Sequence, residues 1–164
     1  MPRTSKINLG ELLGAPNYLA KLLSSFAQKE NKWYDIKTDT PASGIYELEE
    51  KYSNKNPVLK AIFTNGLLKE STYFYPTGEV LCSEKWQDDG LMELSQSFHY
   101  SKQTCQIEKY KKGVVVSSEH FNENGVLERD YSYGEGELRN LDDTPNDLST
   151  SLLIKTWLDK GWKE

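Results

Sequence analysis

Side chains that could do chemistry recur through the middle of this 164-residue chain at similar places in successive segments. The glutamates are Glu70, Glu84, Glu108 and Glu119, and the histidines are His99 and His120. Two carboxylates can act together in glycoside hydrolysis, and two histidines with a carboxylate can hold a metal ion. A glutamate that recurs in each segment, however, is more simply a property of the repeated segment than of one active site.

The other reactive side chains do not complete a catalytic or metal-binding set. Neither histidine has a carboxylate or thiol at the spacing of metal ligands, and the serines lie outside any Gly-x-Ser-x-Gly sequence. No phosphate-binding glycine motif is present. Cys82 and Cys105 form no Cys-x-x-Cys pair and are expected to be reduced thiols. We therefore predict that the chain is not an enzyme, that it has no catalytic or metal-binding residues, and that it uses no cofactor.

Turn-forming residues divide the segment from Tyr52 to Leu138 at regular intervals. The turn positions are Asn56, Gly66, Gly78, Gly90, Gln103, Gly113, Gly125 and Gly136. Four of them belong to pairs that favour hairpins, namely Asn65-Gly66, Thr77-Gly78, Asp89-Gly90 and Asn124-Gly125. Glycine and asparagine reach the positive φ that tight hairpin turns need at low cost. The spacing predicts an antiparallel β-meander of about seven to nine strands over residues 45–138.

Both ends of the chain have the leucine spacing of amphipathic helices. The N-terminal helical region is predicted over residues 7–29, with its firmer part beginning near Pro16, and the C-terminal helix over residues 146–160. Because each helix has an apolar stripe, both are expected to cover the sheet. The predicted fold is therefore α+β, a β-meander of hairpin repeats with a helix at each end, in a single domain spanning residues 1–164.

The charge of the chain limits its partners. The formal net charge is -5 and the lysines and arginines form no basic stripe, which argues against nucleic acid. The same charge suits a basic protein partner. No apolar segment approaches the roughly 18 residues of a membrane span, and the N-terminus does not have the pattern of a signal peptide. We therefore expect no membrane insertion and a cytoplasmic location, whereas the oligomeric state remains open.

An aromatic residue precedes each turn by three or four positions, and several of these rings have the same parity as the recurring glutamates. One face of the sheet is therefore expected to carry both rings and carboxylates. That face is either packed beneath the helices, with its glutamates at the rim or paired, or it is a surface for a ligand. The predicted partner-binding residues are Trp86, Asp88, Asp89, Glu70, Glu84, Glu108 and Glu119. Trp86 beside the acidic turn Asp88-Asp89 is the best single patch, although Trp86 is also a candidate for the core.

The repeated unit resembles the MORN-variant repeat, in which an aromatic, a turn with glycine, a small aliphatic pair and a glutamate follow one another. The matching stretches are residues 63–70, 75–81 and 121–128. The resemblance implies a MORN-like hairpin-repeat sheet and, for one bacterial group, an antitoxin or immunity protein of the cytosol that neutralises a toxin by direct binding. A basic toxin domain is the partner it implies here. A general MORN-like scaffold or adaptor is the main alternative, followed by a small-ligand binder or an enzyme.

Overall fold

The computed structural model describes residues 17–132 and 146–160. Its helices are α2 (Tyr18–Leu23) and α3 (Asn146–Lys160). Its strands are β1 (Phe26–Lys29), β2 (Lys32–Asp35), β3 (Thr40–Pro41), β4 (Gly44–Glu47), β5 (Leu59–Thr64), β6 (Leu67–Phe74), β7 (Val80–Trp86), β8 (Met92–Phe98), β9 (Thr104–Lys111), β10 (Val114–Phe121) and β11 (Leu127–Ser132).

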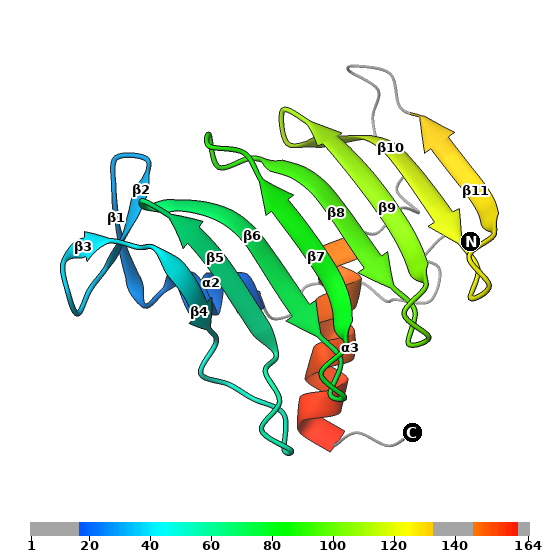
Figure 1. Ribbon diagram of the computed structural model, residues 1–164, viewed down its shortest axis with the longest axis horizontal. Coiled ribbons are helices and arrows are strands. Elements are labelled where there is room, and N and C mark those ends of the chain that lie inside the picture. The colour runs from blue at the N-terminus through cyan, green and yellow to red at the C-terminus, as the bar shows by residue number, and fades with distance from the viewer. Residues whose placement is uncertain (1–16, 133–145, 161–164) are drawn as a thin grey trace.

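The main sheet has eight antiparallel strands in the order β11-β10-β9-β8-β7-β6-β5-β4, so each strand pairs with its neighbours in the chain (Figure 1). This order is a meander, and it confirms the predicted α+β fold. A second sheet of three strands, β1-β2-β3, stands beside the β4 end. This small sheet was not predicted from the sequence.

All four predicted glycine turns join consecutive strands, but they are of two kinds. Asn65 and Gly66 both have positive φ, 48° and 85°, as a two-residue hairpin requires. In the loops at Gly78, Gly90 and Gly125 only the glycine has positive φ. There the amide of the glycine donates to the carbonyl three residues earlier, for example Gly78 to Tyr75 at 2.9 Å. The chain thus uses short hairpins and longer loops for the same purpose.

The longer loops along one edge of the sheet are joined to one another by side chains. The Tyr52 and Tyr75 hydroxyls each donate at 2.7 Å to a strand-end carbonyl 22 or 23 residues further along the chain, those of Phe74 and Phe98. The His99 Nε2 lies 2.8 Å from the Phe121 carbonyl, 22 residues further on. Burial raises the pKa of Tyr75 to about 12, so its hydroxyl keeps the proton that it donates. The structural unit is therefore a pair of strands rather than the single strand implied by the turn spacing.

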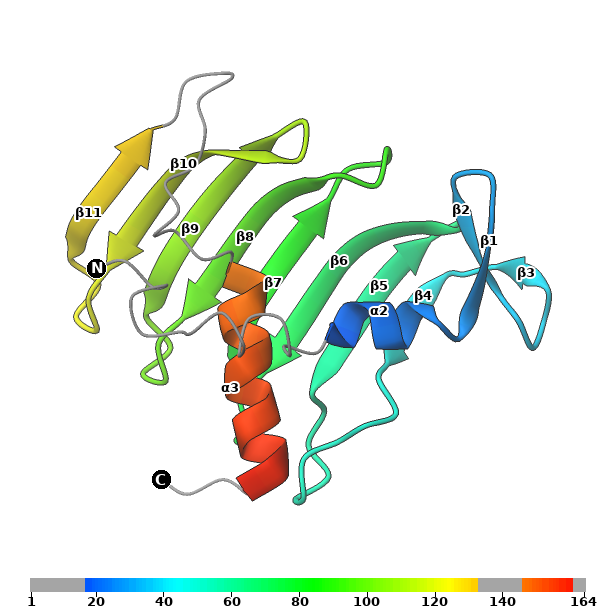
Figure 2. The same cartoon turned by 180° about the vertical axis from the view of Figure 1, so that it is seen from behind.

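Both helices lie on one face of the main sheet, as Figure 2 shows from behind. Leu22 of α2 and Ile154 of α3 are buried in a single core with strand residues such as Leu59. The Trp157 ring lies between the loops, with its centroid 6.4 Å from Tyr52 and 5.5 Å from Tyr75. These contacts confirm that the helices cover the sheet, and they confirm the C-terminal helix over residues 146–160.

The predicted N-terminal helical region, residues 7–29, needs correction at its end. Helix α2 stops at Leu23, where the hydroxyls of Ser24 and Ser25 donate to carbonyls one turn earlier, at 2.6 Å and 2.8 Å. Serine side chains compete in this way with the continuing helix. Phe26 then enters strand β1 and packs against the Tyr46 and Phe63 rings, with centroids 4.9 Å and 5.0 Å away. Residues 7–16 and 133–138 of the predicted elements lie outside the described residues.

Within residues 17–132 and 146–160, neither helix is long and apolar enough to cross a membrane.

We predict that removing a single loop hydroxyl weakens the sheet. Replacing Tyr75→Phe leaves the Phe98 carbonyl without its donor and should lower the free energy of unfolding by about 1 kcal/mol. Tyr34→Phe is the matched control, because the Tyr34 hydroxyl makes no hydrogen bond with any other described residue. Urea unfolding of both variants measures the difference, and equal losses would show that the bond to Phe98 does not stabilise the sheet.

Candidate protein-binding site

A row of polar side chains crosses the helix-covered face of the main sheet. Its members lie directly opposite one another on β6 to β10, in the order Ser71, Glu84, Ser95, Glu108 and Ser118. All five are buried. Polar groups in such a position are stable only with hydrogen-bond partners, and Ser71 supplies one to Glu84, its Oγ donating to Oε1 at 2.8 Å.

The prediction that the four glutamates share one face is wrong. Glu84 and Glu108 are 2% and 0% exposed and cannot contact a partner while the sheet is intact. Glu70 precedes Ser71 and Glu119 follows Ser118, and successive strand residues point to opposite faces, so these two glutamates lie on the other face. The glutamates recur at a similar distance from each turn, but the face on which each one lies depends on the register of its strand.

Trp86 is held by the buried row. Its Nε1 donates to the Ser71 Oγ at 3.0 Å, and that hydroxyl in turn donates to Glu84. The polar edge of the indole is therefore directed into the sheet, while the rest of the ring, which is half-buried, forms part of a surface pocket. Trp86 packs against the core, as one interpretation of the sequence expected, and it also lines a surface pocket, while its role in partner binding stays a prediction.

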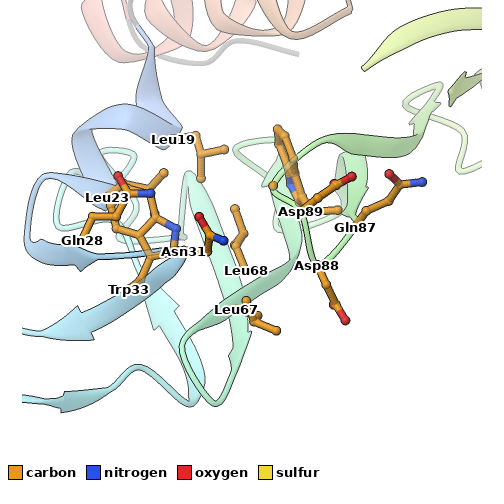
Figure 3. Close-up of a pocket in the computed structure, with 12 residues that line it drawn as sticks. Leu19, Leu23, Gln28, Asn31, Trp33, Leu67, Leu68, Gln87, Asp88 and Asp89 are labelled. Carbon is orange, nitrogen blue, oxygen red and sulfur yellow. The ribbon is translucent and has the colours of Figure 1, made fainter. Parts of the chain in front are cut away.

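The pocket lies where α2, the small sheet and the β7–β8 loop meet, and it has a volume of about 200 Å³. Figure 3 shows Leu23 and Trp33 on one side, Leu67 and Leu68 between, and Asp88 and Asp89 on the other side. Most of the wall is apolar, and the acidic turn forms its rim. The structure thus brings together three of the predicted residues, Trp86, Asp88 and Asp89.

Trp33 owes its place in the wall to a predicted hairpin turn. The Trp33 amide donates to the Gly66 carbonyl at 2.8 Å, and the Gly66 amide donates to the Ala42 carbonyl at 2.7 Å. Gly66 has φ +85°, and a Cβ there would stand 3.0 Å from the Lys32 Cβ. Glycine at this position therefore lets the small sheet approach the main one and bring Trp33 to the pocket.

The rim of the pocket is negative. Asp88 has a largely exposed side chain that pairs with Lys69, and one Asp89 oxygen accepts from the Leu91 amide at 3.0 Å, which fixes the turn. The lining contains these two carboxylates and no lysine or arginine among the described residues.

The wall residues from α2 and the small sheet were missed by the sequence analysis. Leu23 and Gln28 lie in the predicted helical region, and Asn31 and Trp33 lie between that region and the predicted meander. The available signal was the sequence around Glu30 and Asn31, a two-residue turn between strands in which Glu30 has φ 58°. Placing Trp33 beside Trp86 needed the tertiary bond at Gly66, which no local pattern encodes.

No protein-family model matches the chain, and no curated protein matches it. Among solved structures, the chain is similar to accessory secretory protein 1, 2 and 3 of Streptococcus pneumoniae, with 11% identity over 66% of this chain and a TM-score of 0.41. It is also similar to TarM, with 17% identity over 70% and a TM-score of 0.36. A further match is the GtfA/B complex bound to UDP and GlcNAc, with 10% identity over 57% and a TM-score of 0.37.

The chain spans about a fifth of the length of each of these proteins, with 21%, 20% and 23% of their chains covered. Beside these matches, the prediction that the chain is not an enzyme is withdrawn, since it rested only on missing motifs. TarM has been solved in complex with UDP, and the GtfA/B complex was bound to UDP and GlcNAc.

We predict that Ser71 positions Trp86. Replacing Ser71→Ala removes both hydrogen bonds at that hydroxyl and should cost about 1–3 kcal/mol of unfolding free energy. The indole N–H resonance of Trp86 should shift as well, as two-dimensional NMR can record. Ser83→Ala is the control, since the Ser83 Oγ bonds to Glu70 at 3.0 Å on the other face. An unmoved Trp86 resonance in Ser71→Ala would contradict this role.

Proposed function

We propose that this chain binds a basic protein partner through the pocket at Trp86, as an antitoxin or immunity protein of the MORN-variant type in the bacterial cytoplasm. The observation that carries the proposal is the combination of an apolar wall, containing Trp33 and Trp86, with an acidic rim at Asp88 and Asp89. Tryptophan is the residue type that contributes most often to binding hot spots, and charges at a rim steer the approach of a partner.

The pocket suits the side chain of a lysine or an arginine. The carbon stem of such a residue can lie along Leu67 and Leu68 while its charged end reaches Asp88 and Asp89. The existing pair between Lys69 and Asp88 is exposed, so exchanging it for a partner's cation costs little. The site therefore offers both burial of apolar surface and a charge partner.

The size of the pocket favours a protein over a small molecule. Its volume is about 200 Å³. Sites for small ligands usually enclose about 300–1,000 Å³ and bury most of the ligand. A space of this size, open beside the turn, fits one or two side chains on the surface of a partner protein better than it fits a whole small molecule.

The proposal predicts that the acidic rim accelerates association. In Asp88→Lys with Asp89→Asn, the asparagine keeps the oxygen that accepts from Leu91, so the turn should fold normally. The association rate with the basic toxin domain that the proposal requires should fall about tenfold at low salt and lose most of its salt dependence. Stopped-flow or surface-based kinetics between about 50 and 300 mM salt measures both effects.

The matched control is Glu123→Lys with Glu128→Gln, which makes the same change in net charge at exposed positions near β11. It should associate almost as fast as the native chain. In cells, the native chain and the control should relieve growth arrest by the toxin, whereas the rim variant should relieve it less. Equal rates for the two variants would show that the rim does not steer binding, and a native chain that neither binds nor relieves arrest would refute the proposed function.

A further inference from the structure

A second and larger groove lies on the other side of helix α2. Leu23 lines the pocket at Trp86, whereas its neighbour Leu22 lines this groove, so α2 is the wall between the two. The groove has a volume of about 540 Å³ and is formed by the end of α2, the end of β2, and β4 with the residues that follow it. None of the residues predicted from the sequence to bind a partner lies in it.

The floor of the groove is aromatic and rigid. Phe26 is buried, and its ring meets the Tyr46 ring edge to face, with centroids 4.9 Å apart and an interplanar angle of 83°. Tyr46 also meets Phe63 edge to face at 5.5 Å. These contacts fix the half-buried Tyr46 ring while part of its surface faces the groove. A fixed ring at a groove floor is a stacking surface for a flat group.

The rim of the groove is acidic. Its carboxylates are Asp35, Glu47, Glu49 and Glu50, and its cations are Lys21 and Lys37. The hydrogen bond from Lys51 lowers the pKa of Glu47, so this carboxylate stays charged at neutral and mildly acidic pH. Carboxylates outnumber cations among the lining residues, and two further lysines, Lys51 and Lys60, lie against Glu47.

The lysines that pair with these carboxylates are exchangeable. Lys51 lies 2.9 Å and Lys60 lies 3.6 Å from Glu47, and Lys21 lies 3.6 Å from Glu50. All these side chains are substantially exposed, and exposed ion pairs are weak. A better-shaped cation can therefore take their place.

We propose that this groove binds an arginine side chain of a protein partner. A guanidinium is planar, so it stacks on the Tyr46 ring, and its paired N–H groups match a carboxylate at the rim. A lysine ammonium offers the charge but neither the flat surface nor the paired donors. Because α2 separates the groove from the pocket at Trp86, one partner surface that straddles α2 can fill both sites.

The test uses the full chain labelled with ¹⁵N and a peptide, acetyl-Gly-Arg-Gly-Arg-Gly-amide. Titration should shift the amide resonances of Phe26, Tyr46 and Leu48 in a saturable way. The same peptide with citrulline in place of arginine keeps the shape and loses the charge, and it should cause much smaller shifts. Glu49→Gln with Glu50→Gln should weaken binding about fivefold, as expected for exposed charge pairs, whereas Glu123→Gln with Glu128→Gln should not.

Two outcomes would overturn the assignment. The first is equal binding of the citrulline peptide, or no shift with about 20 mM arginine peptide, well above the millimolar affinity of a weak single contact. The second is loss of the shifts at Phe26, Tyr46 and Leu48 in Asp88→Lys with Asp89→Asn, which would place the peptide in the pocket at Trp86. This experiment needs no toxin. The arginine assignment of the groove can therefore be refuted while the proposed function stands, and the proposed function can be refuted while the groove assignment stands.

Discussion

Burial of carboxylates on the covered face of the sheet is the constraint on which the site depends. Glu84 is buried on this face and must be hydrogen-bonded to remain there, and the Ser71 hydroxyl that bonds to it also accepts from Trp86. The alternation of serine and glutamate across β6 to β10 places a small side chain beside each large one. This arrangement directs the N–H edge of the Trp86 indole into the sheet, and the rest of the ring lines the pocket. Glu84, which was predicted to bind a partner directly, thus acts from inside the protein by positioning Trp86 through Ser71.

At one end of the strands of the main sheet, each long loop is hydrogen-bonded to the next one along the chain. Tyr52, Tyr75 and His99 each reach a strand end in the next pair of strands, and Asn122 in the next loop accepts from the Asn124 and Val126 amides instead. At the other end, the turn at Gly66 bonds to Trp33, and the loop at Gly90 carries the acidic rim. The first end therefore holds the pairs of strands together and supports α3. The opposite end is where the small sheet and the proposed binding pocket meet.

The sequence predicted what depends on local chemistry. The glycine turns, the meander and the C-terminal helix follow from turn propensity and leucine spacing, and Trp86 with Asp88 and Asp89 was found because an aromatic and an acidic turn are adjacent in the chain. The face of each glutamate was not predictable from its distance to a turn, since a one-residue difference between Glu70 and Ser71 changes the face. The helix over residues 24–29 was wrong because Leu19, Leu22 and Phe26 have a spacing that suits either one helix or a helix followed by a strand in the same core. Trp33 and the groove at Tyr46 depend on contacts between distant segments.

Two sites lie on either side of α2, one bordered by the acidic turn Asp88-Asp89 and one with Tyr46 in its floor. Together they form the proposed binding surface at this end of the molecule. The acidic groups at both sites are exposed, whereas the rings beneath them are fixed by the core, so binding requires little rearrangement of the chain. Hydrogen–deuterium exchange of the native chain, with and without the basic toxin domain proposed as its partner, tests this account most directly. Exchange should slow at Trp33, Leu68 and residues 87–90 and remain unchanged along β9 to β11. Protection confined to β9 to β11, with none around α2, would contradict it.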